Sequence, residues 1–254
     1  MENIIGLLPC GGLGLRMLPL RYPKELLPIS YCFLPKENSI RPKLSIEFSL
    51  ENFKIAGITK CFVVVPDWKP EIMRYLGDGI DFGMTIAYLH NSRVQGLADA
   101  IFTMEPWSED VITALALPDT QFYPSDAFSL LLAKMNKKNA DVVLGIFPTE
   151  EPQHFGTVEI NDEGMILGVE DKPLNPKSNN IWGIAVWNTI FWKFFKSYKK
   201  SVADGVSISE IFQGAVAEGL RVFGESFEQG VYYDIGRIDH LPFVLKGQGF
   251  AQHA

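Results

Sequence analysis

The stretch LLPCGGLGLRMLPLRYPKELLPIS, residues 7–30, is the most informative part of the sequence for the architecture of the chain. It begins as an apolar run and passes directly into a turn that contains Gly11, Gly12 and Gly14. Glycines after a strand let backbone N–H groups approach an anion closely, so the order predicts a phosphate site at the end of a buried strand. A tight turn also needs glycines for structural reasons alone, so the glycines by themselves leave the ligand open.

Basic residues follow this turn where a dinucleotide-binding helix would normally begin. Met17 stands at the third glycine position of the GxGxxG pattern, and no Lys-Ser pair completes a phosphate-binding P-loop. Arg16 and Lys24 instead supply a guanidinium and an ammonium, both of which bind phosphate oxygens. The loop that carries them is restricted by prolines at positions 19, 23 and 28.

Apolar runs alternate with amphipathic segments through the first half of the chain. We predict strands over 4–9, 61–66, 84–90, 111–119 and 141–147, separated by helices over 45–58, 70–79, 96–104 and 126–139. This alternation predicts an α/β fold, a Rossmann-like and mostly parallel sheet sandwiched by helices. Ligands of such sheets bind along the edge where the strands have their carboxyl ends.

The second half has a different pattern. We predict a β-hairpin over 155–173, strands over 179–188, 220–226 and 230–236, and helices over 189–200 and 207–219. No linker separates the halves, which predicts a single domain over 1–254. It would comprise a nucleotide-binding half of about 1–147 and a smaller inserted β-rich lobe of about 148–254. The polar, proline-bounded segment 31–43 is predicted to be an irregular loop near the site.

Composition excludes several classes of protein. The net charge of −7 argues against non-specific nucleic-acid binding, and no apolar run approaches the length of a membrane span. The three cysteines lack CxxC spacing and the N-terminus lacks a signal peptide, so we expect reduced thiols in a cytoplasmic protein. The four histidines do not cluster in sequence, which favours ordinary histidines over a zinc site.

The segments GGLGLRMLP and PKELLP together resemble the signature of the sugar-1-phosphate nucleotidylyltransferases. Within this family, the chain resembles the glucose-1-phosphate thymidylyltransferases and the UTP–glucose-1-phosphate uridylyltransferases. Four more segments resemble the family in the right order: QGLADAI (95–101), LALPDTQF (115–122), FGTVEINDEGMILGVEDKP (155–173) and YYDIG (232–236). The resemblance implies an enzyme that joins an NTP, UTP or dTTP, to a sugar 1-phosphate with release of pyrophosphate.

The resemblance also implies roles for individual residues. Asp119 and Asp234 would hold one Mg²⁺, while Arg16, Lys24 and Lys172 would contact phosphates. Nucleotide-binding residues would be Gly11, Gly12, Gly14, Asn91 and Gly96, and sugar-binding residues would be Gly156, Asp171, Lys172 and Trp182. The attacking phosphate oxygen is already ionised at neutral pH, so no general base is needed. Catalysis then consists of aligning two polyanions and neutralising their repulsion. Family members are often homo-oligomers, so a homo-oligomer is one possible state of this chain.

The chain departs from the family pattern mainly on the sugar side. Asp171 is shorter than the usual glutamate, Phe155 lacks the usual tyrosine hydroxyl, and Trp182 replaces a small residue. Alternative hypotheses follow from these changes. One is cytidylyl-type transfer to a phospho-alcohol such as phosphocholine, with Trp182 and Tyr232 facing the quaternary ammonium. Another is a non-catalytic nucleotide-sugar-binding regulatory protein, although such a protein would not need both carboxylates. A dehydrogenase is disfavoured by Met17.

Overall fold

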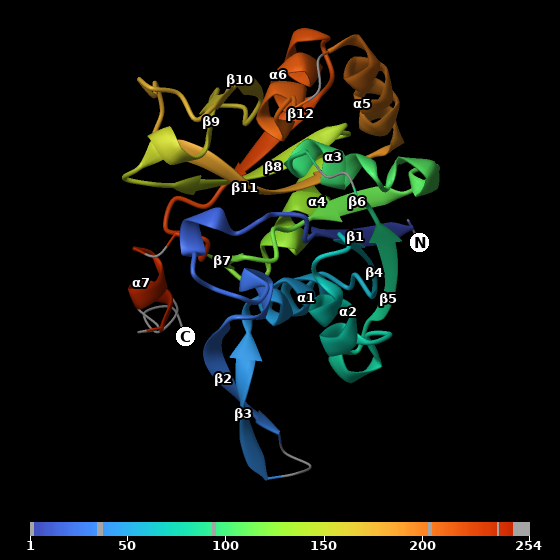
Figure 1. Cartoon of the computed structure of the whole chain (residues 1–254). Coiled ribbons are helices and arrows are strands. Elements are labelled where there is room, and N and C mark those ends of the chain that lie inside the picture. Colours follow the sequence, from blue (N-terminus) through green and yellow to red (C-terminus); the bar gives the residue numbers. More distant parts are fainter. Residues whose placement is uncertain (1–2, 35–37, 93–94, 203–204, 238, 246–254) are drawn as a thin grey trace.

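A central sheet with helices on both faces forms the core of the molecule (Figure 1). The computed structural model describes residues 3–34, 38–92, 95–202, 205–237 and 239–245. The first half supplies β1 (Ile4–Pro9), α1 (Ser45–Ile55), β4 (Lys60–Val65), α2 (Pro70–Leu76), β5 (Thr85–His90), α3 (Leu97–Phe102), β6 (Ile112–Leu115), β7 (Thr120–Tyr123), α4 (Ala127–Lys138) and β8 (Val142–Pro148). The predicted alternation of strands and helices is therefore confirmed.

The second half contributes strands to the same sheet rather than building a sheet of its own. Its elements are β9 (Gly156–Ile160), β10 (Ile166–Asp171), β11 (Asn180–Trp187), α5 (Thr189–Ser201), α6 (Ile208–Ala217), β12 (Val222–Ser226), β13 (Val231–Asp234) and α7 (Leu241–Leu245). The hairpin of β9 and β10 is antiparallel, as predicted. Within the described ranges, every helix is too short or too polar to cross a membrane. The division of the chain near residue 147 stays a prediction.

Strand pairing confirms a mostly parallel sheet and adds two strands of the opposite direction, β10 at one edge and β11 in the interior. Strands β6, β1, β4 and β5 lie side by side and run parallel. Strand β11 is antiparallel and lies between β6 and β8, and β12 pairs with β8 in parallel. The alternation in the first half did not indicate this insertion, because β11 comes from much later in the chain.

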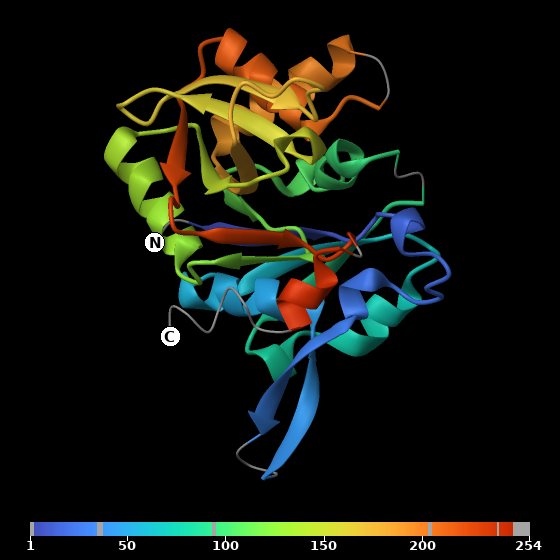
Figure 2. The same ribbon diagram turned by 90° about the vertical axis from the view of Figure 1, so that its left-hand side faces the viewer.

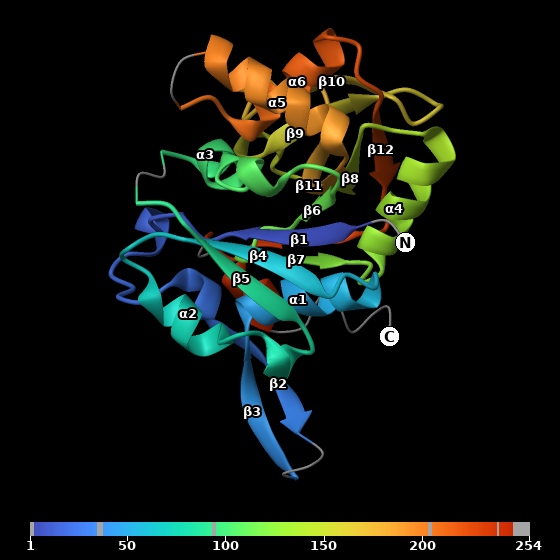
Figure 3. The same ribbon diagram turned by 90° about the vertical axis from the view of Figure 1, so that its right-hand side faces the viewer.

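Two hydrophobic clusters hold the layers together, one on each face of the sheet. Consecutive side chains of a strand point to opposite faces, and Leu8 accordingly belongs to one cluster while Leu7 belongs to the other. Helices α1, α2 and α4 cover the face of Leu8. Helices α3, α5 and α6 cover the face of Leu7, above the sheet in Figure 3. Loops at the carboxyl ends of the parallel strands are left uncovered.

The expected irregular loop over 31–43 is wrong. Strands β2 (Pro28–Leu34) and β3 (Ser39–Leu44) form an antiparallel hairpin that projects from the body (Figure 2). Its sequence alternates in a way that suits a ribbon: Tyr31, Phe33 and Ile40 are exposed, whereas Arg41 is bound to Glu47 of α1. The prolines and charged residues at 31–43 obscured this alternation in the sequence.

Candidate active site

A cleft of about 970 Å³ lies at the carboxyl ends of the parallel strands. Loops after β1, β5 and β6 line one side of it, and residues of β10, β11 and α6 line the other. All but one of the residues singled out in the sequence line this cleft: Gly11, Gly12, Gly14, Arg16, Lys24, Gly96, Asp119, Gly156, Asp171, Lys172, Trp182 and Asp234. Asn91 is not among the described lining residues. Its side chain donates to the Thr103 hydroxyl at 2.7 Å.

Two short 3₁₀ turns after the carboxyl end of β1 carry the basic residues Arg16 and Lys24. Arg16 lies in the 3₁₀ turn Leu15–Met17, which follows Gly14 in a left-handed conformation with φ 65°. Met17 is buried and anchors this turn. Lys24 begins a second 3₁₀ turn directly after Pro23, whose fixed φ suits the start of a helical turn. The residue that breaks the dinucleotide pattern therefore fastens the loop to the core.

Asp119 and Asp234 are brought together by a two-stranded ribbon. Strand β7 begins directly after Asp119 and pairs antiparallel with β13, in a register that sets Asp234 opposite Thr120. The amide of Ile235 also donates to the Asp119 carbonyl at 2.8 Å. The two carboxylates, distant in sequence, therefore end at the same corner of the cleft.

Each carboxylate is paired with one of the basic residues. Lys24 forms an ion pair with Asp119, and both side chains are largely buried, at 12% and 15% exposure. Arg16 Nη2 lies 2.9 Å from Asp234 Oδ2, and its own side chain is 60% exposed. The structure thus brings four of the predicted residues into one charge cluster.

The two carboxyl groups differ in their pKa. Burial alone would raise the pKa of Asp119, but the Lys24 ammonium outweighs burial and holds it below the usual range. Burial raises the pKa of Asp234, the negative charge of Asp119 raises it further, and Arg16 opposes this only in part. Two neighbouring carboxylates therefore meet at this corner, and carboxylates are the oxygen ligands that a hard divalent cation such as Mg²⁺ prefers.

Gly236 is a site residue that sequence reasoning did not single out. A Cβ at this position would lie 2.9 Å from Asp234 Oδ1, 2.9 Å from Lys24 Nζ and 3.2 Å from Arg16 Nη2. Its amide donates to Asp234 Oδ1 at 2.8 Å. The signal in the sequence was the glycine two residues after the aspartate in YYDIG.

The other side of the cleft is built from one buried and two half-buried aromatic rings. Trp182 is 7% exposed, and its Nε1–H donates to the Ser209 hydroxyl at 2.9 Å. Gly156 packs against this ring so closely that a Cβ there would lie 2.2 Å from Trp182 Nε1. Phe155 contacts Tyr232 edge to face, with ring centroids 6.1 Å apart. Lys172 is an exposed cation at the rim of this side.

A buried ion pair beneath the cleft was also missed. Glu25, directly after Lys24 in the sequence, lies 2.6 Å from Lys69, and the two residues are only 2% and 5% exposed. Burial raises the pKa of Glu25, while the Lys69 ammonium lowers it in part. Because Lys69 precedes α2 and Glu25 lies in the turn of Lys24, this pair ties the basic loop to the neighbouring strand–helix connection.

The model of the nucleotidyl transferase family matches residues 7–245. The chain belongs to this family. The nucleotidyl transferase is 27% identical over 229 residues to a glucose-1-phosphate thymidylyltransferase of Neisseria meningitidis, a match that covers 87% of this chain and 75% of the relative. It is 28% identical over 241 residues to the protein of that name in Mycobacterium tuberculosis, covering 93% and 79%.

Solved structures confirm the fold of the nucleotidyl transferase. A Bacillus anthracis protein described as a glucose-1-phosphate thymidylyltransferase, in complex with a sucrose, superposes with a TM-score of 0.84 at 20% identity over 96% of this chain and 94% of that one. An apo UDP-glucose pyrophosphorylase gives a TM-score of 0.78 at 19% identity over 99% and 100%. The predicted Rossmann-like class and family resemblance are confirmed, and this nucleotidyl transferase is an enzyme.

Proposed function

We propose that this nucleotidyl transferase joins UTP or dTTP to a sugar 1-phosphate, forming an NDP-sugar and pyrophosphate. The observation that carries the proposal is the convergence of Arg16, Lys24, Asp119 and Asp234 in one cleft at the carboxyl edge of the sheet. Curated relatives with the same family domain are named glucose-1-phosphate thymidylyltransferases, which supports the substrate class.

The triphosphate is assigned to the side formed by the loop after β1. Gly11, Gly12 and Gly14 offer backbone with little side-chain obstruction there, and the exposed Arg16 guanidinium supplies positive charge. Lys24 lies at the junction of the two sides, where the α-phosphate under attack would be held. Gly96 lines the part of the cleft assigned to the base. Asn91 stays a prediction for the base edge.

Asp119 and Asp234 fit a Mg²⁺ ion by their chemistry and by their position. Both present carboxylate oxygens to one corner, where Lys24 and Arg16 now balance part of the charge. A bound Mg²⁺ supplies charge neutralisation for phosphate oxygens. Asp119 and Asp234 would hold this ion, and Lys24 and Arg16, which now pair with them, would then contact the phosphates.

The acceptor is assigned to the side formed by β10, β11 and α6. Lys172 supplies a cation for the phosphate of the acceptor substrate, and the Asp171 carboxylate accepts a hydrogen bond from one of its hydroxyl groups. Gly156 and Trp182 form the floor of this side. The phosphate oxygen of the acceptor attacks the α-phosphate, and pyrophosphate leaves on the opposite side. The protein contributes alignment and electrostatic stabilisation, and no side chain has to remove a proton.

The test is a panel of nucleotides and acceptors. The protein is incubated with Mg²⁺, each of the common NTPs and a set of sugar 1-phosphates, and pyrophosphate release is measured. We expect release with a pyrimidine nucleotide and a sugar 1-phosphate. CTP with phosphocholine is included, because turnover there would instead establish the phospho-alcohol acceptor. Absence of pyrophosphate from every pair would contradict the proposed function.

A further inference from the structure

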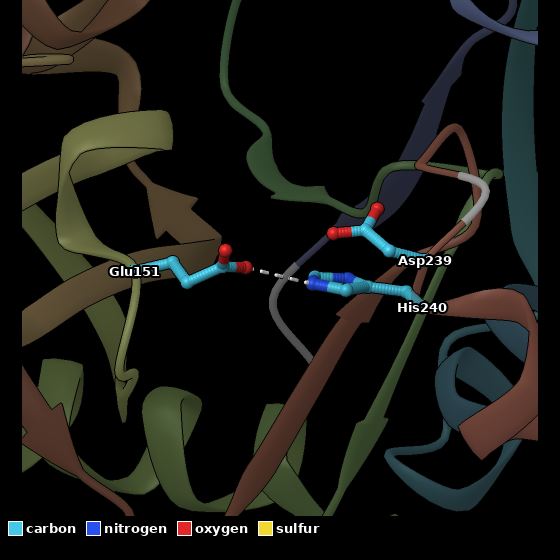
Figure 4. A group of neighbouring side chains, drawn as sticks. All are labelled: Glu151, Asp239 and His240. Atoms are coloured by element: carbon cyan, nitrogen blue, oxygen red, sulfur yellow. Dashed lines mark hydrogen bonds and ion pairs between the residues drawn. The ribbon is translucent and has the colours of Figure 1, made fainter.

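A charged cluster outside the cleft lies next to Asp234. Glu151, Asp239 and His240 bring possible metal-ligand atoms within 4.8 Å of one another (Figure 4). Arg237 Nη2 already lies 2.8 Å from Glu151 Oε2 and 2.6 Å from Asp239 Oδ2. A guanidinium therefore supplies the positive charge of this cluster, and its carboxylates do not need a metal ion to balance them.

His240 connects this cluster to the backbone of Asp234. Its Nδ1 accepts a hydrogen bond from the Asp234 amide at 3.2 Å, which requires the tautomer with the proton on Nε2. That Nε2–H points toward Glu151 Oε2, 3.4 Å away (Figure 4). The ring stacks on Phe155, with centroids 6.3 Å apart and planes 17° apart. His240 is therefore held in one orientation by two residues that come from the segment between β8 and β9.

The polar atoms of Asp234 show what this bond does. Its amide donates to His240, its carbonyl accepts from the Arg237 amide at 3.1 Å, and its Oδ1 accepts from Gly236. Its Oδ2 accepts from Arg16, which lies outside this turn. Among the described residues, His240 is thus the member of the cluster whose side chain bonds to the Asp234 backbone.

We propose that His240 is a positioning residue for Asp234, and that Glu151 and Phe155 set the orientation in which His240 acts. Phe155 also lines the acceptor side of the cleft. The segment that precedes β9 therefore fixes the carboxylate on which the proposed metal site depends. This inference rests on the proposed function for its meaning, but the geometry of the turn can be tested without turnover.

Two substitutions separate the two bonds of His240. An asparagine can place its amide oxygen near the position of Nδ1 and keep the bond from the Asp234 amide, but it cannot reach Glu151. A glutamine can place its amide nitrogen near the position of Nε2 and keep the contact with Glu151, but it leaves the Asp234 amide without its acceptor. His240→Asn and His240→Gln are therefore a matched pair of similar size and polarity.

The experiment titrates the full chain with Mn²⁺ alone and follows free Mn²⁺ by electron paramagnetic resonance. Wild type is expected to bind one ion that Asp234→Asn loses. Since outer-shell partners of metal ligands change metal affinity by about 10–100-fold, we expect His240→Gln to weaken binding by about tenfold or more. His240→Asn should stay close to wild type.

Each outcome decides the question. Equal affinities in the two variants, whether both normal or both reduced, would overturn the positioning role. Wild-type binding that survives Asp234→Asn would overturn it as well. Thermal melting of both variants shows whether either has lost folded protein. A histidine with a purely structural role would not give normal Mn²⁺ affinity in His240→Asn and reduced affinity in His240→Gln. If no nucleotide and acceptor pair supports turnover but His240→Gln still binds Mn²⁺ more weakly than His240→Asn, the proposed function fails and the positioning role stands.

Discussion

The two sides of the cleft are built on different principles. The nucleotide side consists of backbone and charged groups. The loop after β1 carries glycines, Arg16 and Lys24, and the two basic side chains are ion-paired with the neighbouring carboxylates of Asp234 and Asp119. The acceptor side carries Asp171 and Lys172, but its floor is defined by shape: Trp182 is buried, hydrogen-bonded and packed against Gly156. Changes on the charged side should therefore alter whether the chemistry occurs, and changes on the aromatic side should alter which acceptor is used.

The largest effect is expected from Asp119→Asn. The substitution removes a carboxylate from the charged side and leaves the Lys24 ammonium without its partner. We expect turnover to fall by about 10³-fold or more, as is typical when a preorganised electrostatic contact to the reacting groups is lost. Single-turnover product formation measures this directly.

The matched control for Asp119→Asn is Asp239→Asn. Asp239 is also ion-paired to a basic side chain, that of Arg237, but it is exposed and is not among the residues described as lining the cleft. Its substitution should leave turnover within about threefold, since exposed ion pairs contribute little. A wild-type rate in Asp119→Asn would contradict the role of charge on the nucleotide side. An equal loss of rate in Asp239→Asn would show that the effect is not specific to a carboxylate in the cleft.

The next largest effect is expected from Gly236→Ala. The added methyl group would lie 2.9 Å from both Asp234 Oδ1 and Lys24 Nζ, so both charged groups must shift. A misplacement of about 1 Å in an active site typically costs about 10²-fold in rate, and we expect a loss of that order. Gly168→Ala is the control, because a Cβ there meets its nearest neighbour, Gln213 Oε1, at 3.7 Å. Comparable kcat values for the two variants would contradict the prediction.

The sequence predicted the parts of the fold that depend on local patterns. The strand at 4–9, its glycine turn and the alternation to residue 147 are legible because each element has its own periodicity. The placement of β11 between β6 and β8 was not predictable, because pairing between distant strands leaves no local signal. The hairpin at 28–44 was missed for the opposite reason: its alternation was present, but prolines and charges within it resembled a loop.

The candidate site shows the same division. Arg16, Lys24, Asp119 and Asp234 could be singled out from motifs, but which cation pairs with which carboxylate depends on the register of β7 and β13. The ion pair of Glu25 with Lys69 joins two loops and could not be seen in either one alone. Sequence therefore indicated the charged residues, whereas the fold decides their partners.

A smaller effect, confined to the acceptor side, is expected from Trp182→Phe. Phenylalanine keeps a ring but loses the Nε1–H that donates to Ser209, which is 1% exposed. Without this bond the ring at the floor of the acceptor side is no longer fixed in place. A small misplacement of a substrate-positioning group is costly, so we expect the KM for the acceptor to rise about tenfold while the KM for the nucleotide stays unchanged. Initial rates measured with one substrate varied at a time give both constants.

Trp187→Phe is the matched control for Trp182→Phe. Trp187 is on the same strand, is fully buried, and its Nε1 has no hydrogen-bond partner among the described residues. Its substitution should lower the free energy of unfolding without a specific effect on the acceptor KM. An equal rise in the KM for nucleotide and acceptor in Trp182→Phe would show that the two sides are not independent.

The smallest effect is expected from Asp141→Asn, because Asp141 lies away from both sides of the cleft. Burial would raise the pKa of Asp141, but hydrogen bonds from the Arg221 amide and guanidinium and from Asn188 outweigh it and hold the pKa low. A carboxyl whose pKa is depressed by folding stabilises the protein above its unfolded pKa of about 3.9 and loses that contribution as the pH falls through its folded pKa. Because Arg221 is partly exposed, we expect a difference of only about 1 kcal/mol in unfolding free energy at pH 7.

Urea unfolding of wild type and Asp141→Asn at a series of pH values tests this expectation. The two free energies should differ at neutral pH and converge as the pH falls below 4, because the asparagine does not titrate. Both KM values and kcat at pH 7 should match those of wild type, since Asp141 bonds only to residues that do not line the cleft. A change in either KM would mean that a disturbance next to the start of β8 alters the shape of the cleft. The difference between the two sides would then depend on the packing of the sheet as well as on the residues that line the cleft.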